Sequence, residues 1–289
     1  MSNLLITGAT GYIGDRLVEM ALAAGHSVTV LGRRPSARPV RNVPWDLDRP
    51  VPDDAFAGVD AVIHLAHQWQ KGDEPEGEDA NTTGTRALLD AARRHGVARF
   101  VFGSTIVARP DALNKYGRNK ALTEGLLQRP GEVAARIGLV YGGALQALWG
   151  TMCRVAGLGP VLPMLGVDQP VQPIHRDEVC EGLLRLATLP TLSQTVYVLA
   201  GSQPMTFGAF LKLIARQRLG RRLWLLPIPL KLALAAVDLL ALVPGLPKVG
   251  RERVLGLAGM RTLASAADLA AIGLTLRSPA EALKAERPV

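Results

Sequence analysis

A phenol and an amine stand four residues apart in the segment Tyr116-Gly117-Arg118-Asn119-Lys120. On a helix this spacing places both side chains on one face. A tyrosine with a pKa near 10 is a poor base at neutral pH, and a neighbouring ammonium lowers that pKa. The pair predicts acid–base catalysis by Tyr116 with help from Lys120. Because the spacing also arises by chance, the prediction depends on the elements around it.

Two hydroxyl side chains, Ser104 and Thr105, end an apolar run upstream of this pair. Ligands of parallel sheets bind at the carboxyl ends of the strands. We therefore expect these hydroxyls to hold a substrate oxygen beside Tyr116.

Three spaced glycines lie in the segment Thr7-Gly8-Ala9-Thr10-Gly11-Tyr12-Ile13-Gly14. The first permits a tight turn, the second lets a pyrophosphate approach the backbone, and the third permits close packing of the next helix. That helix would point its free N–H groups at the anion. We predict a dinucleotide site here, with a plain glycine-rich turn as the alternative. Its cofactor-binding residues are Gly8, Thr10, Gly11, Tyr12, Ile13 and Gly14.

The end of the next apolar run reads Leu31-Gly32-Arg33-Arg34, without an acidic residue. A carboxylate at this position usually meets the ribose 2′-hydroxyl of NAD, whereas a 2′-phosphate needs arginine. A guanidinium grips a phosphate with two parallel hydrogen bonds. Arg33 and Arg34 therefore predict NADP(H) in preference to NAD(H), unless both are ordinary solvated side chains.

Strands alternate with helices through the first half of the chain. Apolar runs predict strands, and helical spacing of apolar residues predicts helices. The predicted strands are Leu4–Thr7, Ser27–Leu31, Ala61–Leu65, Arg99–Gly103, Val133–Ile137 and Thr195–Leu199, and the predicted helices are Tyr12–Ala24, Asn81–His95, Asn114–Gln128, Asp177–Ala187 and Phe207–Leu219.

This alternation predicts an α/β fold with a doubly wound parallel sheet of the Rossmann type. We expect a dinucleotide-binding core over 1–143. The half over 144–289 should form a smaller, irregular substrate lobe, with elements at about 174–200 returning to the core. Gly157–Pro173 is rich in Gly and Pro and is predicted to be a loop. The acidic stretch Gly72–Asp79 is predicted to be a surface loop.

Taken together, the chain resembles the short-chain dehydrogenase/reductase superfamily, and within it the extended and atypical branches that include epimerases and dehydratases. The resemblance runs from Met1 to about Val179. It depends on motifs in a fixed order: the glycine turn, Asp46-Leu47, His64-Leu65-Ala66-His67, Asn81-Thr82-Thr83-Gly84-Thr85, Phe102-Gly103-Ser104-Thr105, Tyr116 to Lys120, Arg136 to Gly142, and Pro173-Ile174-His175-Arg176-Asp177-Glu178-Val179.

The resemblance implies a role for several positions. Thr105 corresponds to the catalytic Ser/Thr with Ser104 beside it, Tyr116 to the acid/base, and Lys120 to its partner, which also binds the cofactor. Asp46 would meet the adenine amino group with Leu47 against the ring. Cofactor contacts are further implied for Leu65, Ala66, Asn81, Gly138 and Val140.

Each of several assignments has a structural alternative. Asp46 is also typical of a turn, and Asn81 of a helix N-cap. His64 and His67 lack the carboxylates of a metal site, so we predict packed or hydrogen-bonded roles and no metal. Asp177 is predicted to cap a helix.

Two departures from the family pattern bear on the substrate. The span from Thr105 to Tyr116 is shorter than in the extended sugar-nucleotide enzymes, and Arg109-Pro110 replaces the Tyr-Gly of many relatives. Both argue against a nucleotide-sugar substrate. The stretch from Arg221 to Pro247 is similar to bacterial relatives of the nucleotide-binding accessory subunit of respiratory complex I.

The apolar segment Leu223–Leu246 is interrupted by Pro227 and Pro229. Its uninterrupted helix, Leu230–Val243, is too short for the roughly 20 residues that span a bilayer. We expect it to pack on the core, with a surface for a lipid-like substrate, a protein partner or a membrane face as the alternative.

Composition excludes several classes of protein. With 48% hydrophobic and 20% charged residues the chain is not disordered, and two cysteines form no disulfide framework. The net charge of +8 comes from scattered arginines, without the basic run of a nucleic-acid-binding segment. The N-terminus lacks a signal-peptide pattern, so we expect a cytoplasmic location.

Three functions remain open. The first is an NADP(H)-dependent oxidoreductase that acts on a carbonyl or alcohol of a small, hydrophobic molecule. The second is an epimerase or dehydratase that recycles its cofactor. The third is a non-catalytic NADP-binding sensor or assembly factor at a membrane complex, against which the retention of Thr105, Tyr116 and Lys120 argues.

Overall fold

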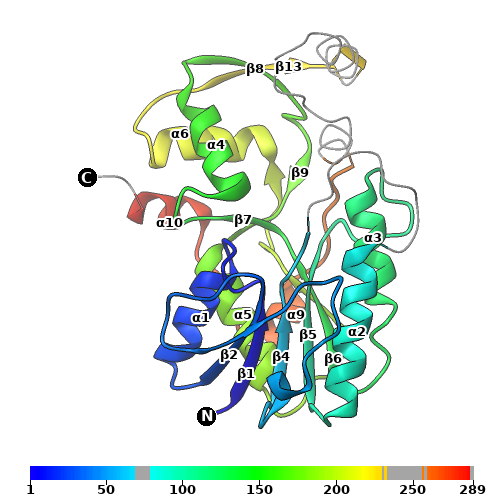
Figure 1. Ribbon diagram of the computed structural model, residues 1–289. Coiled ribbons are helices and arrows are strands. Elements are labelled where there is room, and N and C mark those ends of the chain that lie inside the picture. The colour runs from blue at the N-terminus through cyan, green and yellow to red at the C-terminus, as the bar shows by residue number, and fades with distance from the viewer. Residues whose placement is uncertain (69–78, 230, 233–255, 257–258, 287–289) are drawn as a thin grey trace, which may run out of the picture.

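The computed structural model describes residues 1–68, 79–229, 231–232, 256 and 259–286. Within these residues, seven parallel strands form one sheet in the order β11-β6-β5-β4-β1-β2-β3 (Figure 1). The sequence order reverses between β1 and β4, as in Rossmann folds. The strands are β1 (Asn3–Thr7), β2 (Ser27–Gly32), β3 (Arg41–Pro44), β4 (Ala61–His64), β5 (Arg99–Thr105), β6 (Glu132–Ile137) and β11 (Val196–Leu199).

The central strands are buried on both faces. In β1 the side chains of Leu4, Leu5 and Ile6 have almost no exposed surface, and all four residues of β4 are buried. Continuous apolar runs of this kind are what a covered parallel sheet requires. The six predicted strands are confirmed, each to within two residues at either end, whereas the edge strand β3 was not predicted.

Helices cover both faces of the sheet (Figure 1). On one face, α1 (Gly14–Ala23) and α5 (Arg176–Thr188) share a core cluster with α9 (Ala266–Ala271). On the other, α2 (Ala80–Arg94) packs over a second cluster and contacts α3 (Lys115–Glu124). The turn η1 (Asp53–Phe56) joins this second cluster. The predicted doubly wound α/β fold is confirmed.

A smaller outer lobe lies beyond the carboxyl ends of the strands (Figure 1). Its core surrounds Tyr141, Trp149 and Phe210, which are fully buried. It comprises α4 (Ala147–Gly157), α6 (Phe207–Gln217), α10 (Pro279–Ala285) and three strand pairs: β7 (Leu139–Tyr141) with β10 (Pro173–His175), β9 (Pro170–Val171) with β12 (Met205–Thr206), and β8 (Val161–Leu165) with β13 (Trp224–Ile228). Residues 176–199 return to the sheet as α5 and β11.

The prediction of a loop over Gly157–Pro173 is wrong for the middle of this segment, because the strands β8 and β9 both lie within it. Each is a short strand whose partner, β13 or β12, lies far along the chain. The predicted helix Asn114–Gln128 ends early, at Glu124, because Gly125 follows.

Two predicted segments lie mostly outside the described residues. Only Lys231 and Leu232 of the helix predicted over 230–243 are described, and only Asp79 of the acidic loop predicted over 72–79. In the described part of the chain, no helix combines the length and apolarity needed to cross a membrane.

Candidate functional site

The glycine turn joins β1 to α1 through close backbone contacts. Gly8 has a φ of +69°, and a Cβ on it would lie 2.7 Å from the carbonyl carbon of Leu65. A Cβ on Gly14 would lie 2.1 Å from the carbonyl oxygen of Gly8, so only glycine fits both positions. Gly11 closes the turn by donating its N–H to Gly8 O at 3.0 Å. Ile13, the N-cap of α1, has no polar side chain to occupy the first N–H groups, so the helix N-terminus fits an anion.

Thr7 ties this turn to the segment after β4. Its Oγ1 accepts the N–H groups of Leu65 and Ala66, each at 3.1 Å, and lies 2.6 Å from His64 Nδ1. The other ring nitrogen of His64 lies 2.9 Å from Thr85 Oγ1, and Thr85 already donates to a backbone carbonyl. Nδ1 therefore accepts from Thr7 and Nε2 donates to Thr85. Burial lowers the pKa of His64 to about 3, so it is a neutral structural residue, as predicted.

Asn81 fixes the end of the same segment. Its side chain accepts from Gln68 N at 2.7 Å and donates to Gln68 O at 3.0 Å. The alternative role of Asn81 as an N-cap is wrong, because Asp79 caps α2 by accepting from Thr82 N at 3.0 Å. The family-implied contact of Asn81, Leu65 and Ala66 with a cofactor stays a prediction.

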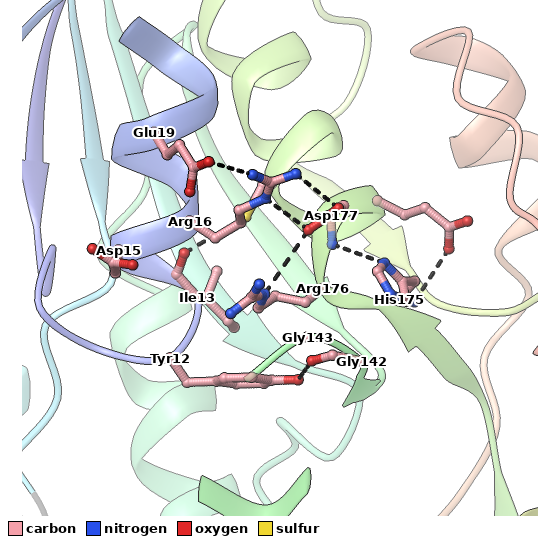
Figure 2. Close-up of polar contacts among 12 residues, drawn as sticks. Tyr12, Ile13, Asp15, Arg16, Glu19, Gly142, Gly143, His175, Arg176 and Asp177 are labelled. Carbon is pink, nitrogen blue, oxygen red and sulfur yellow. Dashed lines mark hydrogen bonds and ion pairs between the residues drawn. The ribbon is translucent and has the colours of Figure 1, made fainter. Parts of the chain in front are cut away.

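Tyr12, at the start of α1, reaches across to the outer lobe (Figure 2). Its hydroxyl donates to Gly142 O at 2.5 Å, in the loop after β7. The guanidinium of Arg176 lies 5.4 Å from the centre of the Tyr12 ring. Burial raises the pKa of Tyr12 above its ordinary value, so it stays protonated. The glycine turn is therefore joined to the outer lobe as well as to the sheet.

Ion pairs lock α1 against α5 beside this contact (Figure 2). Arg16 donates to both carboxylate oxygens of Asp177 at 2.9 Å and pairs with Glu19 at 2.8 Å. Burial alone would raise the pKa of Asp177, but the bonds from Arg16 hold it below its ordinary value. The predicted capping role of Asp177 is wrong, because His175 is the N-cap of α5.

Lys120 is buried on α3, with Tyr116 one turn before it. The helix begins at Asn114, which caps it by accepting from Gly117 N at 3.1 Å. The ammonium of Lys120 donates to Gly103 O at 2.7 Å and lies 4.4 Å from the centre of the Phe102 ring. Burial lowers the pKa of Lys120 to about 8. An amine at this point can change its charge near neutral pH.

Tyr116 differs from the sequence expectation in its pKa. Burial raises the pKa of Tyr116 to about 12, whereas we expected Lys120 to lower it. The amine lies 5.9 Å from the centre of the phenol ring and bonds to a backbone carbonyl instead. In this state the phenol holds its proton at neutral pH and is suited to donate it.

The two hydroxyls at the end of β5 have different surroundings. Ser104 donates to Glu124 Oε1 at 2.5 Å, and Glu124 pairs with Arg136 at 2.6 Å. Thr105 is half-buried at the strand end, where its Oγ1 accepts a long bond from Val107 N at 3.4 Å. Ser104 thus belongs to a buried ion-pair cluster, and Thr105 is the better placed of the two to meet a ligand.

The predicted phosphate site lies on the surface after β2. Arg33 is exposed, with its Nε 3.8 Å from Asp46 Oδ1, and Arg34 beside it is exposed too. Asp46 accepts from the N–H of Leu47, which is buried, at 2.8 Å. Arg33 and Asp46, predicted to meet opposite parts of one nucleotide, are therefore neighbours.

Gly138 and Val140 lie where β6 continues into β7. A Cβ on Gly138 would lie 2.4 Å from Gln172 O, so the backbone of the lobe crosses directly over it. Val140 is half-buried and pairs with Ile174. The role of both residues at a cofactor stays a prediction.

Several predicted residues do converge on one small pocket, together with residues that the sequence did not indicate. His67, for which the sequence predicted a packed or hydrogen-bonded role, is one of the lining residues, and its ring meets Tyr116 edge-on with centroids 5.3 Å apart. Burial, with the charge of Lys120, lowers the pKa of His67 to about 4. In the sequence, this residue was indicated by the second histidine of the motif His64-Leu65-Ala66-His67. The pocket is lined by Ala66, His67, Asn81, Thr85, Phe102, Asn119, Lys120 and Thr123.

Comparisons with known proteins agree with this geometry. Residues 4–130 match the NAD dependent epimerase/dehydratase family. Ceramide reductase from Caulobacter vibrioides is 31% identical over 196 residues, which cover 65% of this chain and 61% of that protein. NADH dehydrogenase (ubiquinone) 1 alpha subcomplex subunit 9 from Dictyostelium discoideum is 24% identical over 226 residues, 72% of this chain and 62% of that protein.

Among solved structures, UDP-N-acetylglucosamine 4-epimerase from Bacillus cereus superposes with a TM-score of 0.75 at 16% identity, covering 99% of this chain and 98% of that one. At this identity the likeness concerns the fold. The chain spans less than two thirds of the length of the two curated relatives. With its glycine turn, its Tyr116–Lys120 helix and the match over 4–130, the first half of the chain is similar to the NAD dependent epimerase/dehydratase family.

Proposed function

We propose that this protein is an NADP(H)-dependent oxidoreductase that reduces a carbonyl, or oxidises the matching alcohol, on a small hydrophobic molecule. The observation that carries the proposal is the pair on α3: a half-buried, protonated phenol at Tyr116 and a buried amine at Lys120 with a pKa near 8. A protein that had lost its chemistry would have no need to bury the amine of Lys120, because desolvating an ionisable side chain costs stability.

The glycine turn and the N-terminus of α1 would hold the cofactor pyrophosphate, and Arg33 with Arg34 its 2′-phosphate. Bound nicotinamide supplies or accepts a hydride at the substrate carbon. Tyr116 donates its proton to the oxygen that becomes a hydroxyl, and Thr105 orients that oxygen. Burial and the charge of Lys120 lower the pKa of His67, so that this imidazole stays neutral beside the protonated phenol of Tyr116.

The hydrophobic substrate is supported by two observations. The relative with 31% identity is named a ceramide reductase, which indicates a long-chain substrate for that protein. The short span between Thr105 and Tyr116 leaves less chain for binding a nucleotide sugar. A cofactor-recycling epimerase or dehydratase is the second candidate, favoured by the family match over 4–130.

Replacement of the phenol tests the chemistry. In Tyr116→Phe we expect turnover to fall by roughly 10²- to 10⁴-fold, because the positioned acid is lost, while NADPH affinity stays within about twofold. The assay follows NADPH oxidation with long-chain ketones and with sugar-derived ketones. Tyr197→Phe is the matched control, since that tyrosine is buried in β11 and bonds only to the backbone of Ser193 and Gln194. Full turnover in Tyr116→Phe would remove this residue from the mechanism.

Replacement of the two arginines tests the cofactor preference. Arg33→Ser with Arg34→Ser should weaken NADPH binding by roughly 10- to 100-fold, because charge-assisted bonds to the phosphate are lost, and leave NADH binding nearly unchanged. Calorimetric titration with both cofactors measures the two affinities. Equal losses for NADPH and NADH would show that the arginines do not read the 2′-phosphate.

A further inference from the structure

The outer lobe ends in a two-stranded ribbon, β8 with β13, that lies farthest from the seven-stranded sheet (Figure 1). The register pairs Val161 with Trp224 and Pro163 with Leu226. Because side chains alternate along a strand, these four residues share one face of the ribbon. All four are exposed, and Trp224 is 65% exposed. The ribbon therefore presents an apolar outer face.

The inner face of the same ribbon is apolar as well. Leu162, Met164 and Leu225 point the other way and pack against the core of the lobe. A ribbon with one face in water normally alternates apolar with polar residues. Here all ten residues of the two strands, Val-Leu-Pro-Met-Leu and Trp-Leu-Leu-Pro-Ile, are apolar. The outer face thus has the composition of a covered surface.

Exposed leucines also precede β8 and follow β13 in the chain. Leu158, just before β8, is 73% exposed, and Leu232, after β13, is 63% exposed. The start of the ribbon is held by two hydrogen bonds, because Trp224 N donates to Pro160 O at 2.7 Å and Arg221 donates to Gly157 O at 2.5 Å. A preformed surface loses little conformational entropy when it binds.

Basic residues precede and follow β13, at Arg221, Arg222 and Lys231, and others lie elsewhere on the lobe. Residues 144–175 and 201–232, which make up most of the lobe, contain a single acidic residue, Asp168, and helix α10 adds Glu281 and Lys284. The same two ranges carry six exposed cations, at Arg154, Lys212, Arg216, Arg221, Arg222 and Lys231. Most of the net charge of +8 is therefore concentrated on the lobe that bears the ribbon.

We propose that the β8–β13 ribbon docks on the surface of an anionic lipid membrane. Apolar side chains enter the boundary between headgroups and acyl chains while flanking lysines and arginines meet anionic headgroups. Tryptophan is enriched at this boundary, since its ring is apolar and its N–H is polar. A second copy of the chain fits less well, because a symmetric contact would bring Arg221, Arg222 and Lys231 of both copies together.

Vesicle flotation tests the proposal on the full chain. Vesicles of phosphatidylcholine with 30% phosphatidylglycerol should carry the protein upward at low salt, whereas pure phosphatidylcholine vesicles and 0.5 M salt should reduce the floated fraction by roughly tenfold. Failure to float with the anionic vesicles would overturn the proposal.

Two pairs of variants locate the contact. Trp224→Ser with Leu226→Ser should lower partitioning by about 30-fold or more, since two apolar anchors are lost. Leu122→Ser on α3 is the control, as its exposure of 53% matches the 54% of Leu226. The double variant Arg222→Glu with Lys231→Glu should lower partitioning by roughly tenfold or more. Its control is Arg49→Glu with Arg129→Glu, at exposed positions of the core, which should leave partitioning unchanged.

All four variants should keep the circular dichroism spectrum and the NADPH affinity of the wild type. A change in vesicle binding then reflects the substituted surface and not misfolding or loss of the cofactor. Trp224→Phe should also reduce a blue shift of fluorescence on vesicle addition, because Trp45 and Trp149 are buried already and any contribution of Trp69, which lies outside the described residues, is common to both proteins. Flotation that survives both ribbon variants would place the contact elsewhere and overturn the proposal. So would a Trp224-dependent dimer in light scattering that does not bind vesicles, which would assign the ribbon to a second copy.

Discussion

The glycine turn and the β8–β13 ribbon are built on opposite principles. At the turn, backbone meets backbone: a Cβ on Gly8 or Gly14 would fall within 2.7 Å of a main-chain atom. At the ribbon, Val161, Trp224 and Leu226 each have more than half of their surface exposed. The glycine turn has almost no room for added side-chain volume. The ribbon has room for substitutions, but its exposed apolar face is unfavourable in water.

This difference separates binding determined by shape from binding determined by composition. The turn is made by residues consecutive in the chain, and its close contacts fix where an anion can sit. The ribbon is made by strands about 60 residues apart, and any apolar surface of matching charge would satisfy it. Substitutions should therefore damage the turn through folding and cofactor binding, and the ribbon through association alone.

The largest effect is expected from Gly14→Ala. The new Cβ would lie 2.1 Å from Gly8 O, so α1 must move away from β1. We expect the free energy of unfolding to fall by about 3 kcal/mol or more, and NADPH binding to be lost with it. Urea unfolding and calorimetric titration measure the two effects.

Gly32→Ala is the matched control for this prediction. Gly32 ends β2, and a Cβ there would meet nothing within 4 Å. The change should be neutral or stabilising by up to about 1 kcal/mol. Equal behaviour of the two alanine variants would show that the turn is looser than its contacts indicate.

A second prediction compares a buried lysine of the core with an exposed one of the lobe. Burial lowers the pKa of Lys120 to about 8 in the folded protein, against about 10.4 in an unfolded chain. Between these values the unfolded chain binds more protons, so the contribution of Lys120 to the free energy of unfolding rises with pH. Between pH 7.5 and 9.5, the free energy of unfolding of Lys120→Met should therefore rise by roughly 2 kcal/mol less than that of the wild type.

Urea unfolding of wild type and variant at both pH values measures that difference. Groups common to both proteins, including the buried tyrosines and cysteines, cancel in the comparison. Lys212→Met, on the exposed surface of α6, should follow the wild-type pH dependence. If Lys120→Met also followed the wild-type pH dependence, the amine of Lys120 would be hydrated in the folded protein and would have an ordinary pKa.

The parts of the site that the sequence predicts are those formed by neighbours in the chain. The turn over 7–14 follows a strand and precedes a helix, so its shape is a local property. Tyr116 and Lys120 share α3 for the same reason. Burial is a property of the whole fold, and the pKa of Tyr116 was therefore predicted to shift downward although it is raised.

Long-range contacts account for the remaining differences. The bond from Tyr12 to Gly142 and the pair Arg16–Asp177 join residues more than 120 positions apart, and no spacing rule indicates them. The pairing of β8 with β13 has the same origin, since each strand alone is a short, proline-containing run typical of a loop.

The smallest effect is expected from Leu226→Ser in the ribbon. This side chain is 54% exposed, so the free energy of unfolding should change by no more than about 0.5 kcal/mol. Leu211→Ala in α6, a fully buried position of the same lobe, should cost about 3 kcal/mol because it leaves a cavity. Urea unfolding of both variants gives the contrast directly. If the free energy of unfolding of Leu226→Ser fell by more than about 2 kcal/mol, the outer face of the ribbon would already pack against protein. The ribbon would then resemble the glycine turn, where close packing limits substitution.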